Sequence, residues 1–290
     1  MPKTFYNILV PIDFSGRNKW AIAKAIELAN NFHCNIHFVH VVSDDIIPFV
    51  PISSKGLKIF DNSAAMFNAR TRLEEMRDNY REHLCNGNIE ISVIEGNRRE
   101  ELAKYIDQYE MDLVVVGLAK FNLVHRVLSS VSISSLAQRT AVPVLAIRSS
   151  GLISHFKKIV LPLTDEVPIR RIKLATMLAR SFKSTVYLVS LRKDGSASEN
   201  ILNKALEVVQ SISTIPVQSF MLEGKNLAQS TLEFSRRINA DLIMANPFKD
   251  FHMPGWWNRI TNKLLSYGSN IPVMTVDKQN EKPPSPLKGE

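Results

Sequence analysis

The sequence contains one pattern twice, and this internal repeat limits the folds open to the chain more than any other feature. Tyr6–Ser15 (YNILVPIDFS) is a short apolar run that leads through a proline to an acid, and Lys158–Glu166 (KIVLPLTDE) repeats it 151 residues later. Each copy is followed by an amphipathic stretch and then by a second apolar run. In the first copy these are residues 20–29 and 35–42, and in the second copy they are residues 169–179 and 185–191. Continuous apolar runs are typical of strands buried on both faces.

The two halves also match further along. Ile94-Glu95-Gly96 corresponds to Leu222-Glu223-Gly224, each before a helical stretch. Two more pairs of apolar runs match: Met111–Gly117 with Ala240–Asn246, and Val142–Ile147 with Ile271–Val276. Both pairs are separated by the same 129 residues, as Asp112 is from Asp241 and Pro143 from Pro272. A period this long indicates a duplicated domain rather than a solenoid repeat.

Strands that alternate with helices predict βαβ units and therefore parallel sheets. We expect an α/β protein with two tandem doubly wound, parallel five-stranded sheets, Rossmann-like, with helices on both faces. The predicted domains are residues 1–150 and 151–277, and the Lys-, Pro- and Glu-rich tail 278–290 is predicted to be disordered. Ligands of such sheets bind beyond the carboxyl ends of the strands, which here are Ile12–Ser15, Val41–Asp45 and Gly117–Ser130.

Composition and charge narrow the function. The net charge of +8 is uneven: residues 1–150 hold 17 Lys/Arg and 16 Asp/Glu, and residues 151–290 hold 19 and 12. No basic cluster carries interleaved aromatic residues, which argues against nucleic acid. The two cysteines have no paired spacing, and we find no signal peptide and no apolar run of the roughly 20 residues that a membrane span needs. The sequence therefore predicts a cytoplasmic protein.

No catalytic arrangement is recognisable. The sequence has no P-loop, no GxGxxG motif and no Ser-His-Asp, Cys-His or paired-carboxylate motif, so we expect a binding protein rather than an enzyme. One group of residues resembles a metal-binding cluster by its spacing in the sequence: His33, Cys34, His37 and His40. If they lie on a strand, His37 and His40 point to opposite faces, which disfavours a metal site.

Taken together, these residues resemble the universal stress protein family in its tandem two-domain form. The resemblance is carried by Val10–Ser15, the strand end at His40-Val41, Asp112–Gly117 and Ala141–Arg148. It implies an adenine nucleotide alpha hydrolase-like fold, a regulatory role in the stress response, ATP binding with no metal beyond Mg²⁺, and dimer formation. It also implies that the last strands, 142–147 and 271–276, pair so that the two domains form an intramolecular pseudo-dimer; a homodimer is a further expectation.

The resemblance also places a ligand site in the first domain. ATP-binding members carry G-x2-G-x9-G-(S/T), in which small residues let backbone N–H groups surround phosphates. Gly117 matches the first glycine, Lys120 stands at the second, and Ser130, or Ser129 and Ser130 after a one-residue slip, stand at the end. The expected cofactor-binding residues are Pro11, Ile12, Asp13, Val41, Gly117, Lys120, Ser129 and Ser130. Asp13 matches the acid on the adenine side.

The second domain departs from this pattern at every position. Thr164 replaces the acid, and Asn246, Lys249, Arg259 and Ile260 stand in place of the phosphate-loop residues. We therefore expect adenine nucleotide binding in the first domain only. The apolar insertion 44–56 is predicted to fold over that site.

Four alternatives stay open. Asp13 would serve equally as a cap for the following helix, and Lys120 either binds phosphate or blocks the site. The whole chain is open to a second interpretation as a protein–protein interaction module, in which the basic second domain binds an acidic, unidentified partner. An ATP-hydrolysing enzyme is the least favoured reading.

Overall fold

The computed structural model describes residues 5–42, 62–118, 133–148, 155–192, 196–246 and 270–276. The chain divides into two compact units: unit 1 is residues 1–153 with 270–272, and unit 2 is residues 154–269 with 273–290. The predicted lid 44–56 and the predicted tail 278–290 lie outside the described residues. The pairing of the two last strands stays a prediction.

Unit 1 is a parallel five-stranded sheet in the order β3-β2-β1-β4-β5. Its elements are β1 (Asn7–Pro11), α1 (Asn18–Phe32), β2 (Asn35–Val42), α2 (Ser63–Arg81), β3 (Ile89–Glu95), α3 (Arg98–Gln108), β4 (Leu113–Leu118), α4 (Ile133–Thr140) and β5 (Val144–Arg148). The chain runs outward from β1 to β3 and then crosses back to β4, so the strand order reverses between β1 and β4.

Unit 2 repeats this topology with the strand order β10-β9-β6-β7-β8. Its elements are β6 (Lys158–Leu163), α5 (Ile169–Phe182), β7 (Thr185–Leu191), α6 (Ala197–Ile212), β8 (Val217–Leu222), α7 (Leu227–Arg237), β9 (Leu242–Ala245) and β10 (Val273–Thr275). The reversal falls between β6 and β9. The predicted fold, two tandem parallel α/β units, is therefore confirmed.

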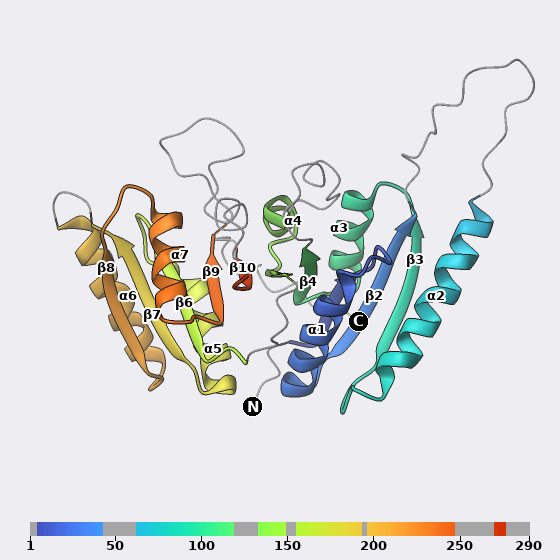
Figure 1. Cartoon of the computed structure of the whole chain (residues 1–290), viewed down its shortest axis with the longest axis horizontal. Coiled ribbons are helices and arrows are strands. Elements are labelled where there is room, and N and C mark those ends of the chain that lie inside the picture. The colour runs from blue at the N-terminus through green and yellow to red at the C-terminus, as the bar shows by residue number, and fades with distance from the viewer. Residues whose placement is uncertain are drawn as a thin grey trace, which may run out of the picture. The chain divides into compact units, whose positions relative to one another are not determined.

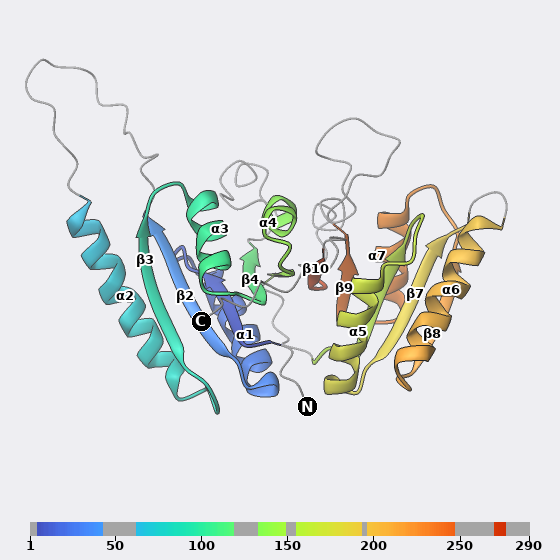
Figure 2. The same cartoon turned by 180° about the vertical axis from the view of Figure 1, so that it is seen from behind.

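The apolar runs of the sequence form the cores of the two sheets. Ile8, Leu9 and Val10 of β1 are fully buried, as are Ile159 and Val160 of β6. Helices cover both faces of each sheet: two views from opposite sides show α1 and α3 on opposite faces in unit 1, and α5 and α7 on opposite faces in unit 2 (Figures 1 and 2). Among the described residues, no helix combines the length and apolar character needed to cross a membrane.

The repeated aspartates have the same structural task in both units. In unit 1, Asp112 Oδ2 accepts hydrogen bonds from the backbone N–H groups of Tyr6 (2.6 Å) and Asn7 (3.0 Å). In unit 2, Asp241 Oδ2 accepts them from Lys157 (3.0 Å) and Lys158 (2.9 Å). Each carboxylate stands just before the fourth strand and ties it to the beginning of the first.

The repeated glycines also have a physical reason. Gly96 and Gly224 have φ angles of 133° and 134°, which side-chain-bearing residues rarely adopt. Shortly after each, an asparagine caps the next helix: Asn97 accepts hydrogen bonds from two backbone N–H groups of α3, and Asn226 from two of α7. The residues that repeat in the sequence are thus those that form the same hydrogen bonds, turns and helix caps in the two units.

We predict that Asp112→Ala and Asp241→Ala each lower the free energy of unfolding by about 1–2 kcal/mol, because two hydrogen bonds to a charged, partly exposed acceptor are lost. The Asp→Asn variants, which keep an oxygen acceptor, should lose less. Urea unfolding followed by circular dichroism measures the change, with Glu207→Ala on the exposed face of α6 as the control. Aspartate variants as stable as that control would contradict the assigned role.

Candidate functional site

The candidate site of unit 1 lies where β1 and β4 diverge. The register between these strands covers only Ile8 with Leu113 and Leu9 with Val114, whereas β1 stays paired with β2 up to Pro11. Ile12 then continues on the β2 side, where its N–H donates to Val39 O at 2.8 Å. Beyond this point the loop 12–17 leads into α1 at the carboxyl end of the sheet, the position at which doubly wound proteins bind ligands.

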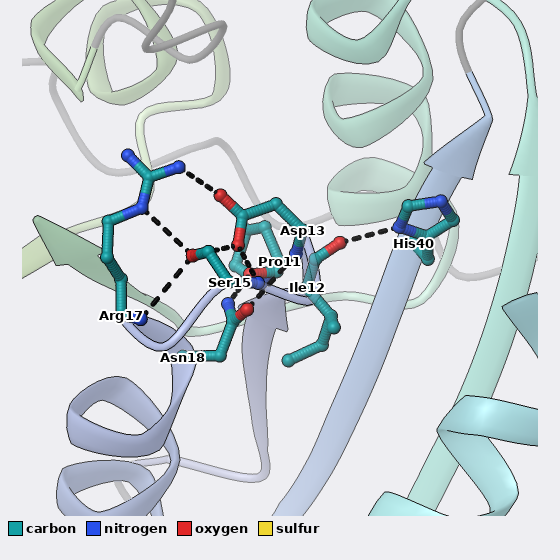
Figure 3. A network of polar contacts seen from close by, with 7 residues as sticks. All are labelled: Pro11, Ile12, Asp13, Ser15, Arg17, Asn18 and His40. Atoms are coloured by element: carbon teal, nitrogen blue, oxygen red, sulfur yellow. Dashed lines mark hydrogen bonds and ion pairs between the residues drawn. The ribbon is translucent and has the colours of Figure 1, made fainter. Parts of the chain in front are cut away.

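Asp13 is the centre of a polar network in this loop (Figure 3). Its Oδ1 atom accepts hydrogen bonds from the Ser15 N–H at 3.0 Å and from the Ser15 hydroxyl at 2.5 Å. Its Oδ2 atom accepts a hydrogen bond from Nη2 of Arg17, which also makes this contact an ion pair. Arg17 Nε donates to Ser15 Oγ at 2.9 Å, so the guanidinium turns back over its own loop.

This network keeps the carboxylate of Asp13 ionised. Partial burial on its own would raise the pKa of Asp13, but the hydrogen bonds from Ser15 and the charge of Arg17 outweigh it, so the pKa lies below its ordinary value. The side chain of Asp13 remains 28% exposed. A charged acceptor is therefore held at the carboxyl end of β1 within reach of solvent.

Two side chains hold the backbone of the loop from either side. The Asn18 amide receives the Asp13 N–H at 3.3 Å and donates to Pro11 O at 3.2 Å. On the other side His40, from β2, donates from Nδ1 to Ile12 O at 2.8 Å (Figure 3). Since a carbonyl oxygen can only accept, Nδ1 carries the proton. Burial is the main cause that lowers the pKa of His40, so the neutral ring is favoured.

Phe14 gives the loop an unusual backbone. Its φ angle is 57°, in the left-handed region that a residue with a bulky side chain rarely occupies. Its ring lies against the His40 ring, with centroids 4.6 Å apart, and the Arg72 guanidinium of α2 lies 4.0 Å from its centroid. These two contacts of the ring help to hold the strained turn that follows Asp13.

Gly117, the predicted first glycine of a phosphate loop, has a structural reason of its own. A Cβ atom at this position would lie 2.3 Å from the backbone oxygen of Arg17. Only glycine lets the end of β4 approach the start of α1 this closely. The glycine therefore belongs to the same junction as Asp13 and Arg17.

The structure brings some of the predicted ligand residues together. Pro11, Ile12, Asp13 and Gly117 gather at the diverging ends of β1 and β4, and Val41 is buried in β2. Lys120, Ser129 and Ser130 lie outside the described residues. Asp13 does not cap α1, because that helix begins at Asn18 and its N-cap, Arg17, makes no side-chain capping bond.

Sequence reasoning missed Arg17, Asn18 and His40 as parts of this site. Arg17 stands four residues after Asp13, which is a recognisable spacing for an ion pair, but only across a helical turn. Here a left-handed residue makes the turn instead. The sequence indicates His40 as a candidate metal ligand and as part of the strand end that carries the family resemblance, but not as a hydrogen-bond partner of the loop.

The histidines do not form a metal site. His33 ends α1 in a left-handed conformation and lies outside β2. His37 is buried and its Nδ1 lies 3.0 Å from the hydroxyl of Tyr105, whose pKa burial raises to about 12. Within the described ranges, no three His, Cys, Asp or Glu side chains are grouped closely enough to hold a metal ion.

The corresponding junction of unit 2 is built from different chemistry. Thr164 takes the place of Asp13, and a buried arginine enters from α5. Arg171 is only 3% exposed, and its Nη1 donates to Pro162 O of β6 at 3.1 Å and to Met244 O of β9 at 3.4 Å. Burial lowers the pKa of Arg171 to about 10, opposed by the charge of Glu166. In unit 2 a guanidinium thus bridges the two diverging strands.

Comparison with solved structures places this fold. A universal stress protein from Archaeoglobus fulgidus DSM 4304 superposes with a TM-score of 0.72 at 14% identity, over 95% of this chain and 97% of that chain. A functionally unknown protein from Pseudomonas aeruginosa PAO1 superposes with a TM-score of 0.55 at 14% identity, over 95% and 93% of the two chains. The tandem α/β architecture is therefore a known one. No curated protein matched the sequence.

The sequence comparison identifies the family. The model of the Universal stress protein family matches residues 4–148, which is half of the chain and includes all the described elements of unit 1 up to β5. The chain belongs to the universal stress protein family.

We predict that Gly117→Ala lowers the free energy of unfolding by about 1–3 kcal/mol, because the added methyl group forces the Arg17 carbonyl or β4 to shift. Gly16→Ala is the matched control: a Cβ there meets nothing within 4 Å. Both variants restrict the unfolded chain equally, so the difference between their urea midpoints isolates the close approach. Equal midpoints would contradict it.

Proposed function

We propose that this protein is a binding protein that takes an adenine nucleotide at the β1–β4 junction of unit 1, and that unit 2 takes none. The observation that carries the proposal is the Asp13 carboxylate, held ionised and 28% exposed at the carboxyl end of β1. The family resemblance gives an acid at this position the adenine side of the ligand. A charged acceptor suits an exocyclic amine or a ribose hydroxyl, both of which donate.

The surroundings of Asp13 favour a ligand that also carries negative charge. Arg17 lies next to the carboxylate, and the charges of Arg72 and Arg98 both act on His40 at the end of β2. The N-terminus of α1, a 15-residue helix, begins directly after Arg17. Arg17 at this helix N-terminus, with Arg72 over the ring of Phe14 in the same loop, forms a positively charged surrounding that suits a phosphate group.

Two features support confining the ligand to unit 1. Thr164 supplies a hydroxyl in place of the Asp13 carboxylate, and the buried Arg171 guanidinium occupies the junction of β6 and β9. A base-reading acid is absent from that position, and the carbonyl groups at the junction are already hydrogen bonded. Unit 2 then serves as a structural partner or as an interaction surface of the basic half of the chain.

The proposal places this chain among regulatory proteins rather than enzymes, and in the cytoplasm. In the described residues both cysteines, Cys34 and Cys85, are thiols rather than a disulfide, which suits a reducing compartment. ATP, with Mg²⁺ on its phosphates, is the nucleotide expected from the family.

We predict that Asp13→Ala weakens adenine nucleotide binding by about 10- to 150-fold, the equivalent of losing roughly 1.5–3 kcal/mol of charge-assisted hydrogen bonding. Asp13→Asn, which keeps the shape and removes the charge, should lose a similar amount. Calorimetry with ATP, ADP and AMP on the full chain measures both affinity and stoichiometry, which should be one nucleotide per chain.

Thr164→Ala is the matched control in unit 2 and should change neither quantity. An equal loss from Thr164→Ala would place the ligand in unit 2 as well. Absence of binding by the unmodified chain at millimolar nucleotide would favour the interaction module.

A further inference from the structure

Arg17 occupies the position that a ligand of Asp13 would have to approach. Both oxygens of the carboxylate are engaged: Oδ1 by the N–H and hydroxyl groups of Ser15, and Oδ2 by the Arg17 guanidinium. A carboxylate oxygen can accept about two hydrogen bonds, and Oδ1 already accepts two. A donor group of the ligand therefore has to bind at Oδ2, beside Arg17 or in its place. Arg17 is therefore a competitor for any neutral group that Asp13 would bind.

This competitor is held weakly enough to move. The side chains of Asp13 and Arg17 are 28% and 31% exposed, and ion pairs with this much solvent contact contribute little to stability. The backbone of Arg17, in contrast, is fixed, because its carbonyl packs against Gly117 and its N–H lies 3.4 Å from Ser15 Oγ. The guanidinium can exchange its ion pair with Asp13, together with its Nε hydrogen bond to Ser15 Oγ, for another anion while its Cα stays at the start of α1.

A phosphate group is the partner for which such an arginine is suited. The guanidinium offers a planar fork of donors that matches phosphate oxygens, and its position before the N-terminus of α1 adds the favourable end of the helix dipole. A nucleoside carries no anion that would replace the lost ion pair. A nucleotide supplies a second anion that accepts the arginine.

We propose that Arg17 is the residue that makes unit 1 select phosphate-bearing nucleotides over nucleosides: it shields Asp13 in the unliganded chain and transfers to a phosphate of the ligand. This rests on the proposed function, because it assumes that Asp13 binds the adenosine part. The movement of Arg17 from Asp13 to the phosphate links the binding of the adenosine part to the binding of the phosphate. Release of the Asp13 carboxylate and capture of the phosphate are one movement of one side chain.

The test is calorimetry of adenosine and AMP with the full chain and its Arg17→Ala variant. Removal of the competitor should strengthen adenosine binding by about 1.4-fold to fivefold, the range of a partly exposed ion pair. Loss of the phosphate partner should weaken AMP binding by about tenfold or more. The ratio of the AMP affinity to the adenosine affinity should therefore fall by at least about fourteenfold, and the preference of the unmodified chain for AMP should shrink as salt is raised.

Two further variants make the result specific. Arg17→Lys keeps the charge without the planar fork and should fall between the unmodified chain and Arg17→Ala. Arg70→Ala is the matched control: Arg70 forms an ion pair with Glu74 four residues on, at 3.2 Å on the exposed face of α2, and its loss should leave both affinities unchanged. In Arg17→Ala, adenosine binding should strengthen while AMP binding weakens. A disturbed loop would instead weaken the binding of both ligands, so this result separates selection by Arg17 from a structural role.

The outcomes are distinguishable. If Arg17→Ala weakens adenosine and AMP equally, or changes neither, the selection role is wrong and nucleotide binding in unit 1 still stands. If neither ligand binds the unmodified chain or any Arg17 variant at millimolar concentration, the proposed function fails and this inference fails with it. Adenosine binding that appears only in Arg17→Ala would support the inference directly.

Discussion

The divergence of the first and fourth strands is the constraint on which the rest of each unit depends. Where β1 leaves β4, and β6 leaves β9, backbone carbonyls lose the partner that a continuous sheet would give them, and a buried carbonyl needs a donor. Each unit supplies one from the helix that follows its first strand. Unit 1 uses the amide of Asn18 on Pro11 O, and unit 2 uses the guanidinium of Arg171 on Pro162 O.

These two solutions lead to different junctions. Asn18 is neutral and compact, and it leaves the Asp13 carboxylate as the charged group at the end of β1. Arg171 reaches across to Met244 O and fills the junction of unit 2 with a positive charge of its own. The duplicated fold thus has a carboxylate at this position in one unit, on which the proposed ligand site rests, and in the other a guanidinium that links the two diverging strands. The difference arises from which residue of the first helix completes the backbone hydrogen bonds.

Much of the fold could be predicted because the repeated residues carry repeated physical tasks. Asp112 and Asp241 bind the same pair of N–H groups, and Gly96 and Gly224 take the same left-handed turn. The position of Asp13 followed from the end of a buried apolar run. Its partner could not be predicted, because the turn at Phe14 obeys no periodicity. Arg171 could have been noticed as an arginine at a position that is apolar in the other copy. When the two helices are aligned at their last residues, Phe32 and Phe182, Arg171 corresponds to Ala21, which is fully buried.

The central claim, that ligand binding is a property of the unit 1 junction alone, is tested most directly by amide hydrogen exchange with and without AMP. We predict that AMP slows exchange in Ile12–Asn18, where the loop holds Asp13 and Arg17, and leaves exchange in the corresponding segment Leu163–Ile169 of unit 2 unchanged. Protection of equal size in both segments, or protection confined to Leu163–Ile169, would contradict it.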